Sequence, residues 1–309
     1  MDEQSQLIDT EELPPDHRSG FVALVGKPNV GKSTLLNAWM GVKLAPVSPK
    51  PQTTRSRLLG ILTRPDAQLI FVDTPGIHKP RTKLGDYMVT TAKKAIPDAD
   101  VILFLVDLST PPTDEDRQVA RIIAAHKQIP AILAMNKADL LGADRLRRRR
   151  AEYEALGTFE DVFCISALYG QGLDELLARI LSLLPLGPRY YPEEQISDQP
   201  ERIIAADLIR EQVLIHLRQE VPHAVAVTVQ EFTERPNGML YISAYIYTER
   251  PTQKAIVIGR GGTMLKKIGQ DARMALEAFF ERRVYLELWV KVRKNWRKDE
   301  YSLREFGYA

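Results

Sequence analysis

The segment from Phe21 to Leu35, FVALVGKPNVGKSTL, restricts the fold of this chain more than any other part of its sequence. Its first residues form an apolar run that is typical of a buried strand. The following residues match the spacing G-x-x-x-x-G-K-[ST] of a phosphate-binding loop, and a helix-forming run comes next. In such a loop the backbone N–H groups turn inward around phosphates, Lys32 reaches the outer phosphates, and the Ser33 hydroxyl binds Mg²⁺. The residues predicted to surround the phosphates are Gly26, Lys27, Pro28, Asn29, Val30, Gly31, Lys32, Ser33 and Thr34.

Strand and helix patterns alternate along the next 150 residues or so. The predicted strands cover 21–26, 57–63, 67–73, 100–107, 130–136 and 161–165. The predicted helices cover 32–40, 83–95, 114–127, 143–155 and 173–184. This alternation indicates an α/β domain with a mostly parallel sheet and helices on both faces. The second and third strands are too close in sequence for a parallel crossover, so we expect them to be antiparallel.

A proline-rich stretch separates this domain from a second one. We expect a flexible acidic tail over 1–19, the first domain over 20–186, a linker over 187–200 and the second domain over 201–309. The second domain is expected to be α+β. Its predicted elements are a helix at 201–219, strands at 224–232 and 239–248, helices at 251–258 and 263–281, and a strand at 283–293.

Composition sets only broad limits on the kind of protein. A chain of 309 residues with 44% apolar and 27% charged residues can bury two cores, and its net charge of +2 favours no particular partner. Cys164 is the single cysteine, which excludes an internal disulfide. The polar N-terminus does not match a secretory signal, and the apolar runs are too short to span a bilayer. We therefore expect a cytoplasmic protein.

Three further motifs follow predicted strands. Asp73-Thr74-Pro75-Gly76 comes after the strand at 67–73, where an aspartate can hold Mg²⁺ and a glycine N–H can meet a γ-phosphate. Asn136-Lys137-Ala138-Asp139 matches N-K-x-D, in which a buried carboxylate accepts two hydrogen bonds from guanine. Ser166-Ala167 follows the last strand and is expected to support the same base. In this order the motifs resemble those of the translation-factor-related class of GTPases.

That resemblance implies two further features. A switch I threonine should close on Mg²⁺ and the γ-phosphate, and Pro51-Gln52-Thr53-Thr54-Arg55 occupies the corresponding place. We choose Thr54 and keep Thr53 as the alternative. The residue after Gly76 is Ile77, where many relatives have a glutamine that orients the attacking water. Related GTPases with an asparagine at the position of Asn29 are thought to use K⁺ instead; the alternative for Asn29 is a simple turn residue. Lys32, Thr54, Gly76 and Asn29 are therefore the predicted catalytic residues, and Ser33, Thr54 and Asp73 the predicted Mg²⁺ ligands.

The second domain contains a different loop. Ile258-Gly259-Arg260-Gly261-Gly262 is a G-x-x-G turn between two predicted helices, and Lys266 and Lys267 follow it. In a KH module such a loop binds about four nucleotides of single-stranded RNA. The helix–strand–strand–helix–loop–helix–strand order is that of a type II KH fold. The predicted RNA-binding residues are Gly259, Arg260, Gly261, Gly262, Lys266 and Lys267.

A P-loop GTPase domain joined to a KH domain resembles the bacterial Era family. The resemblance rests on GKPNVGKS, PQTTR, DTPG, NKAD, IGRGG and the stretch Val221–Val227, and it covers the chain from Phe21 onward. It implies slow hydrolysis of GTP to GDP with Mg²⁺, binding near the 3′ end of small-subunit ribosomal RNA, assistance to 30S assembly, no DNA partner and occasional peripheral membrane association. Two alternatives stay open: an RNA-binding module with an inactive nucleotide site, and a GTPase acting on tRNA or protein partners.

Overall fold

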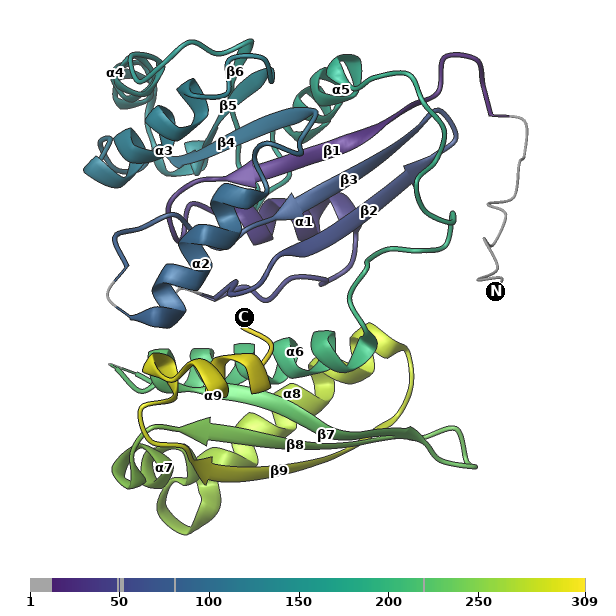
Figure 1. The fold of residues 1–309 in the computed structure, drawn as a ribbon, viewed down its shortest axis with the longest axis vertical. Helices are drawn as coiled ribbons and strands as arrows, with labels where there is room; N and C mark the ends of the chain where they lie inside the picture. The colour runs from purple at the N-terminus through teal and green to yellow at the C-terminus, as the bar shows by residue number, and fades with distance from the viewer. Residues whose placement is uncertain (1–12, 49, 51–52, 81, 219, 309) are drawn as a thin grey trace. The chain divides into compact units, whose positions relative to one another are not determined.

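The computed structural model describes residues 13–48, 50, 53–80, 82–218 and 220–308, and Figure 1 shows its fold. The chain divides into two compact units. The first comprises Met1–Met40, Leu58–Thr74 and Lys93–Asp198, and the second Gly41–Arg57, Pro75–Ala92 and Gln199–Ala309. Each unit is therefore assembled from segments that are far apart in the sequence.

The first unit is built on a six-stranded sheet with the order β2-β3-β1-β4-β5-β6. The strands are β1 (Arg18–Val25), β2 (Leu58–Arg64), β3 (Ala67–Asp73), β4 (Val101–Asp107), β5 (Ala131–Asn136) and β6 (Asp161–Cys164). Only β2 runs against its neighbour, as the short connection to β3 predicted. The central strands β3, β4 and β5 are buried almost throughout, which is typical of a sheet covered on both faces.

The helices of this unit begin and end close to their predicted positions. They are α1 (Lys32–Met40), α3 (Asp114–Ala124), α4 (Ala143–Glu154) and α5 (Leu173–Leu183). Thr113 caps α3 through a reciprocal capping box with Asp116, which ends the preceding loop at a defined residue. Trp39 of α1 stacks on Phe71 of β3 and donates its indole N–H to the carbonyl of Leu173, so α1 is held to the sheet and to the start of α5.

The predicted linker is attached to the first unit along most of its length. The amide of Ile61 donates to the carbonyl of Ile196, and the Ser197 hydroxyl donates to the carbonyl of Leu59. Gln68 accepts the amides of Tyr190 and Tyr191. This stretch therefore satisfies backbone groups of β2, which would otherwise be a bare sheet edge.

The second unit contains an α+β domain with three strands in the order β7-β8-β9. Its elements are α6 (Glu201–His216), β7 (Ala226–Glu234), β8 (Leu240–Thr248), α7 (Pro251–Ile258), α8 (Thr263–Phe280), β9 (Val284–Val292) and α9 (Glu300–Glu305). Strands β8 and β9 are parallel, and β7 is antiparallel to β8. Helices α6 and α8 pack together on one face of this sheet (Figure 1).

Two loop segments from the first half of the sequence belong to this second unit. Helix α2 (Lys83–Lys94) places Leu84 and Met88 in a buried cluster with Trp296, Leu303 and Phe306. The segment 41–57 is joined to α6 by polar contacts described below. The predicted domain boundaries followed the sequence motifs and did not anticipate that Gly41–Arg57 and Pro75–Ala92 belong to the second unit.

Several expected boundaries need correction. Strand β1 begins at Arg18, and both His17 and Ser19 are buried, so the predicted tail over 1–19 extends too far; residues 1–12 lie outside the described residues. Helix α6 ends at His216, before the predicted residue 219. Helix α9 was missed because its six residues are too few to show a helical period.

Candidate functional site

The predicted phosphate-binding loop joins β1 to α1 in the first unit. Gly31 has φ +103°, and a Cβ there would lie 2.2 Å from the Asn136 amide nitrogen, so only glycine fits. Asn29 has φ +63°, a left-handed conformation that asparagine tolerates better than most residues. The amide of Leu35 donates to the carbonyl of Gly31, which starts the helix directly behind the loop. The N-terminus of α1 therefore lies directly behind the loop, a position whose backbone dipoles suit an anion.

Lys32 and Ser33 lie at the start of α1 with their side chains directed to the site. The Lys32 ammonium is buried and donates to the carbonyls of Gly26 and Lys27 at 3.3 and 3.1 Å. Burial lowers the pKa of Lys32 to about 8, against a smaller opposing effect of Asp73. A buried lysine that donates to two carbonyls of the phosphate loop and has its pKa lowered by desolvation suits a residue whose partner is phosphate.

The predicted Mg²⁺ ligands of the first unit are adjacent. The Ser33 hydroxyl donates to the Asp73 carboxylate at 2.7 Å, and Asp73 is fully buried at the end of β3. Thr74, the next residue, donates to the carbonyl of Leu24 and fixes the chain where it leaves the sheet. A hydroxyl and a carboxylate at this distance, in a buried position beside a lysine, fit a hard divalent cation with oxygen ligands.

Asn136 ties three motifs together. Its amide nitrogen donates to the carbonyl of Val30 at 2.8 Å, and its amide oxygen accepts the backbone N–H groups of Lys137 and Ala167 at 2.8 and 2.9 Å. Asn136 is buried at the end of β5. Its role is therefore to hold the phosphate loop, the N-K-x-D turn and the Ser166-Ala167 loop in register.

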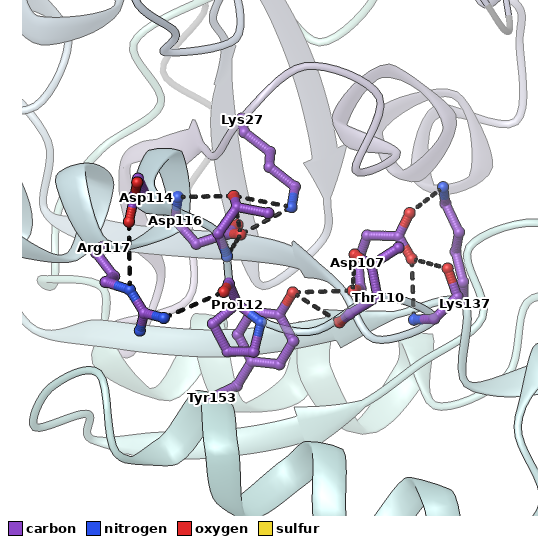
Figure 2. A network of polar contacts seen from close by, with 11 residues as sticks. Lys27, Asp107, Thr110, Pro112, Asp114, Asp116, Arg117, Lys137 and Tyr153 are labelled. Carbon is purple, nitrogen blue, oxygen red and sulfur yellow. Dashed lines mark hydrogen bonds and ion pairs between the residues drawn. The ribbon is translucent and has the colours of Figure 1, made fainter.

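Figure 2 shows how Lys137 and Lys27 are held by acids that the sequence analysis did not single out. Lys137 donates to Asp107 at 2.6 Å. Burial alone would raise the pKa of Asp107, but hydrogen bonds from Lys137 and Ser109 lower it below its usual value. The Tyr153 hydroxyl donates to the carbonyls of Asp107 and Thr110 and so fixes the loop after β4 (Figure 2).

On the other side of this network, Lys27 forms an ion pair with Asp116 at 2.7 Å (Figure 2). Asp116 is fully buried and also accepts the amide and hydroxyl of Thr113. The side chain of Lys27 therefore anchors the loop to α3, and only its backbone is left for phosphate. The pattern Thr113-x-x-Asp116 is a helix-start pattern that could have located this support in the sequence.

The predicted guanine pocket is formed in part. Ala138 donates its amide to the carbonyl of Ile165, which brings the two base-contacting loops together. Asp139 is exposed, so the expectation of a buried carboxylate is wrong, and a bound base would have to shield it from water. Ser166 is buried, and its hydroxyl has no hydrogen-bond partner among the described residues.

The switch I candidates belong to the second unit, where polar contacts hold segment 41–57 against α6. Glu211, 1% exposed, accepts the amide of Val47 at 2.7 Å and pairs with Lys43 at 2.6 Å. Buried Arg210 donates to the carbonyl of Thr53. Thr53 is buried, and its hydroxyl donates to the carbonyl of Lys50; Thr54 is half-buried. Pro51 and Gln52 lie outside the described residues.

Arg55 extends this attachment to the start of β7. It is 2% exposed, and its guanidinium donates to the carbonyls of Val225 and His223 at 2.7 and 3.3 Å. The same group lies 5.6 Å from the ring centroid of Trp296 and 5.8 Å from that of Tyr308. Burial lowers the pKa of Arg55 to about 10, with Tyr308 opposing the shift.

The segment after the D-T-P-G motif also lies in the second unit. Pro75, Gly76 and Ile77 are buried, and Ile77 is fully so. His78 is hydrogen-bonded through Nδ1 to the carbonyl of Gly76 at 2.9 Å. An apolar, fully buried Ile77 has no group with which to orient water, as its side chain already indicated.

The G-x-x-G loop lies between α7 and α8, as predicted. Gly259, Gly261 and Gly262 have φ values of +74°, +59° and +80°. A Cβ on Gly259 would lie 2.6 Å from Cβ and 2.8 Å from N of Met264, so the first glycine is required by close packing. Arg260 and Gly261 are exposed. The loop therefore presents backbone and one cation to solvent.

An open groove of about 430 Å³ begins at this loop. It is lined by Gly262, Leu265, Lys266, Gly269, Gln270, Arg273, Leu286 and Leu288, from α8 and β9. Of the two lysines predicted to bind RNA, Lys266 lines the groove, whereas the exposed Lys267 is not among the lining residues. Gln270 and Arg273 were missed, although Gln270 lies one helical turn after Lys266 and Arg273 one turn after Gln270. A lining that combines leucines with polar and cationic side chains suits unpaired bases with a phosphate backbone.

Comparison with known proteins agrees with both domains. Residues 21–137 match the family of 50S ribosome-binding GTPases, and residues 220–297 match the KH domain family. GTPase Era of Ruminiclostridium cellulolyticum is 47% identical over 94% of this chain and 98% of its own length. GTPase Era of Caldanaerobacter subterraneus is 49% identical over 95% of this chain and 98% of its own length.

Solved structures extend the likeness to the whole fold. A variant of Aquifex aeolicus Era bound to GDP and aluminium fluoride has a TM-score of 0.90 at 41% identity, covering 94% of this chain and 99% of that one. An Era structure with MgGDPNP and nucleotides 1506–1542 of 16S ribosomal RNA has a TM-score of 0.87, also at 41% identity, covering 95% and 99%. With a phosphate loop, a guanine motif and a KH loop each in its expected fold position, this chain belongs to the Era family of GTPases.

Proposed function

We propose that this protein is a GTP-dependent switch that binds small-subunit ribosomal RNA near its 3′ end and assists 30S assembly. The observation that carries the RNA part is the G-x-x-G loop opening onto the groove between α8 and β9. Its lining combines apolar side chains with Lys266 and Arg273, which matches single-stranded RNA rather than a duplex. The related Era structure with 16S nucleotides 1506–1542 supplies the candidate RNA.

The nucleotide part rests on Lys32, Ser33 and Asp73. Lys32 offers a buried cation to the outer phosphates, and Ser33 and Asp73 offer oxygen atoms to Mg²⁺. When bound, Mg²⁺ supplies positive charge that neutralises the phosphate oxygens. The loop N–H groups and Lys32 stabilise the charge that develops during hydrolysis, because they are already oriented before the nucleotide arrives. We expect slow intrinsic hydrolysis, of the order of 10⁻² s⁻¹ or below.

Asn29 is the proposed contact for a K⁺ ion that compensates for the apolar Ile77. Its left-handed backbone supports a turn role as well. Asn29→Gly separates the two, since glycine keeps the backbone conformation and removes the side-chain amide. If K⁺ acts through this amide, K⁺ accelerates wild-type hydrolysis over Na⁺ at matched ionic strength and the variant loses the difference. Equal rates in the two salts would leave Asn29 with the turn role alone.

Thr54 is the proposed switch I ligand. Thr53 is buried whereas Thr54 is half-buried, which favours Thr54 as the more accessible hydroxyl. Closing Thr54 on Mg²⁺ would have to work against the contacts of Arg55, Arg210 and Glu211 within the second unit. We therefore expect nucleotide state to change RNA affinity, with GTP uncovering the surface around Gly259 to Gly262 and hydrolysis covering it again. By linkage, RNA changes nucleotide affinity by the same factor, typically about 5- to 150-fold.

RNA affinity measured with GDP or with a non-hydrolysable GTP analogue tests this coupling. Gly261→Asp adds a negative charge where phosphate approaches, so it should abolish RNA binding and leave GTP affinity nearly unchanged. Gly307→Asp is the matched control, because Gly307 also has a positive φ and open space around it. Identical RNA affinities in both nucleotide states would reduce the protein to two tethered activities. RNA binding by the Gly261→Asp variant would remove the groove assignment.

The family resemblance is also the basis for proposing a cytoplasmic location with peripheral membrane association. Within the described ranges, none of the helices is long and apolar enough to cross a membrane. Co-sedimentation with vesicles of mixed neutral and anionic lipid tests the peripheral association. Recovery of the protein only in the supernatant would argue against it.

A further inference from the structure

The solvent face of the β7–β9 sheet carries a group of aromatic side chains, which we call the aromatic face: Tyr241 and Tyr245 of β8, and Tyr285 and Trp289 of β9. Strand alternation places them opposite the helices, since the β8 neighbours Ile242 and Ile246 are fully buried. The register pairs Tyr241 with Tyr285 and Tyr245 with Trp289. Tyr285 is 46% and Trp289 59% exposed.

Cations lie on these rings. The Arg235 guanidinium lies 4.6 Å from the ring centroid of Tyr241 and 5.1 Å from that of Tyr285, whose rings stack at 5.9 Å. The Lys291 ammonium lies 3.4 Å from the centroid of Tyr245. Cross-strand stacking stabilises a sheet and accounts for the tyrosine pair. It does not account for Trp289, whose large apolar surface remains mostly in water.

The aromatic face shares β9 with the proposed RNA groove. Leu286 and Leu288 of β9 line the groove, and the alternating residues Tyr285 and Trp289 belong to the opposite face. β9 is the edge strand of the sheet, so no further strand separates the two surfaces. A chain leaving the groove across this edge reaches Trp289 and Tyr285 directly. Four residues along a strand separate these two rings by about 13 Å, which allows two stacking positions.

From this continuity we propose that the aromatic face is a second binding surface for single-stranded RNA, which takes the nucleotides next to those held in the groove. The inference rests on the proposed RNA-binding function and extends its footprint. Bases stack on Trp289 and Tyr285, and phosphates meet Arg235 and Lys291, the combination of aromatic platforms and cations used for unpaired strands. Glu287 lies between the two rings and accepts the Tyr241 hydroxyl at 3.0 Å. Its charge repels phosphate from the centre of the face, so the strand binds with its bases inward.

The test compares two RNAs on the full-length protein. One is the 16S segment 1506–1542, and the other is an oligomer of about four nucleotides, the length that fills the groove alone. Trp289→Ala should weaken binding of the long RNA by about 5- to 150-fold and leave the short RNA unaffected. Trp289→Tyr should restore most of the loss. Tyr301→Ala is the control, because Tyr301 is 71% exposed in the same unit but lies on α9.

The outcomes distinguish this inference from the proposed function. The groove and the aromatic face are both supported if Gly261→Asp binds neither RNA and Trp289→Ala loses affinity for the long RNA alone. If Trp289→Ala and Tyr285→Ala leave the long RNA unaffected while Gly261→Asp abolishes binding, the second surface is refuted and the groove stands. If the wild-type protein binds neither RNA, the proposed RNA-binding function is refuted, and the second surface, which rests on it, is refuted as well. Loss of vesicle or protein binding in Trp289→Ala with RNA affinity unchanged assigns the face to another partner and overturns the inference.

Discussion

Replacing Arg55 by methionine tests whether the switch I segment is held by its buried cation. Methionine keeps much of the side-chain length and removes the two bonds to the carbonyls of Val225 and His223. Those bonds and the contacts with Trp296 and Tyr308 together are worth about 5 kcal/mol. Burial, reinforced by Arg210 and opposed by Tyr308, lowers the pKa of Arg55 from 12.5 to about 10, a net cost to the charged form of about 3 kcal/mol. We therefore expect Arg55→Met to destabilise the second unit by about 2 kcal/mol.

Urea unfolding followed by tryptophan fluorescence measures this change, because Trp296 is buried beside Arg55 and reports on the second unit. Arg57→Met is the control. Arg57 is exposed two residues further along, and its replacement should change stability by less than about 0.5 kcal/mol. A neutral or stabilising Arg55→Met would show that desolvation outweighs the contacts, as happens for some buried charges. In that case the reasoning that Arg55 anchors the segment would be refuted.

Three further predictions address the two sites. Asp139→Asn should weaken GTP binding by about 100-fold or more and favour xanthosine nucleotides, because the two hydrogen bonds from guanine to a charged acceptor are lost. Unchanged GTP affinity in a fluorescent-nucleotide titration would remove the assignment of Asp139 to the base pocket. Lys32, with its pKa lowered from 10.5 to about 8, is mostly neutral at pH 9 before nucleotide binds, and bound phosphate should raise that pKa again. GDP binding should therefore make Lys32 take up a proton at pH 9, whereas at pH 6.5 Lys32 is already charged and takes up almost none. Calorimetry at each pH in buffers of different ionisation enthalpy measures the uptake, and buffer-independent heats at pH 9 contradict it. Gly259→Ala should distort the RNA loop, because the added Cβ meets Met264, and should reduce RNA affinity at least 10-fold. The control Gly307→Ala should leave RNA affinity unchanged. Equal RNA affinities for the two variants would show that the close packing at Gly259 is dispensable.

The sequence by itself determined the order of elements and most of their ends. Apolar periodicity and the glycines of the two loops act over a few residues, and such local signals placed α1 at 32–40 and α7 at 251–258 without error. The short 64–67 connection likewise determined the antiparallel pair. The phosphate loop, Asp73 and the G-x-x-G turn were located because each depends on residues that are adjacent in sequence.

Tertiary structure alone decided which polar groups support those motifs. Asn136 was predicted from its motif to contact nucleotide, and only the structure shows that its amide also joins three loops. Lys27 likewise pairs with an aspartate 89 residues away. Arg55, Arg210 and Glu211 look like surface residues in the sequence, since charged residues are seldom fully buried. They are buried because segment 41–57 packs against α6 and the start of β7. A buried charged side chain is stable there only if carbonyls, aromatic rings or opposite charges surround it. Such pairings depend on which distant segments meet, and no local pattern of residues encodes that.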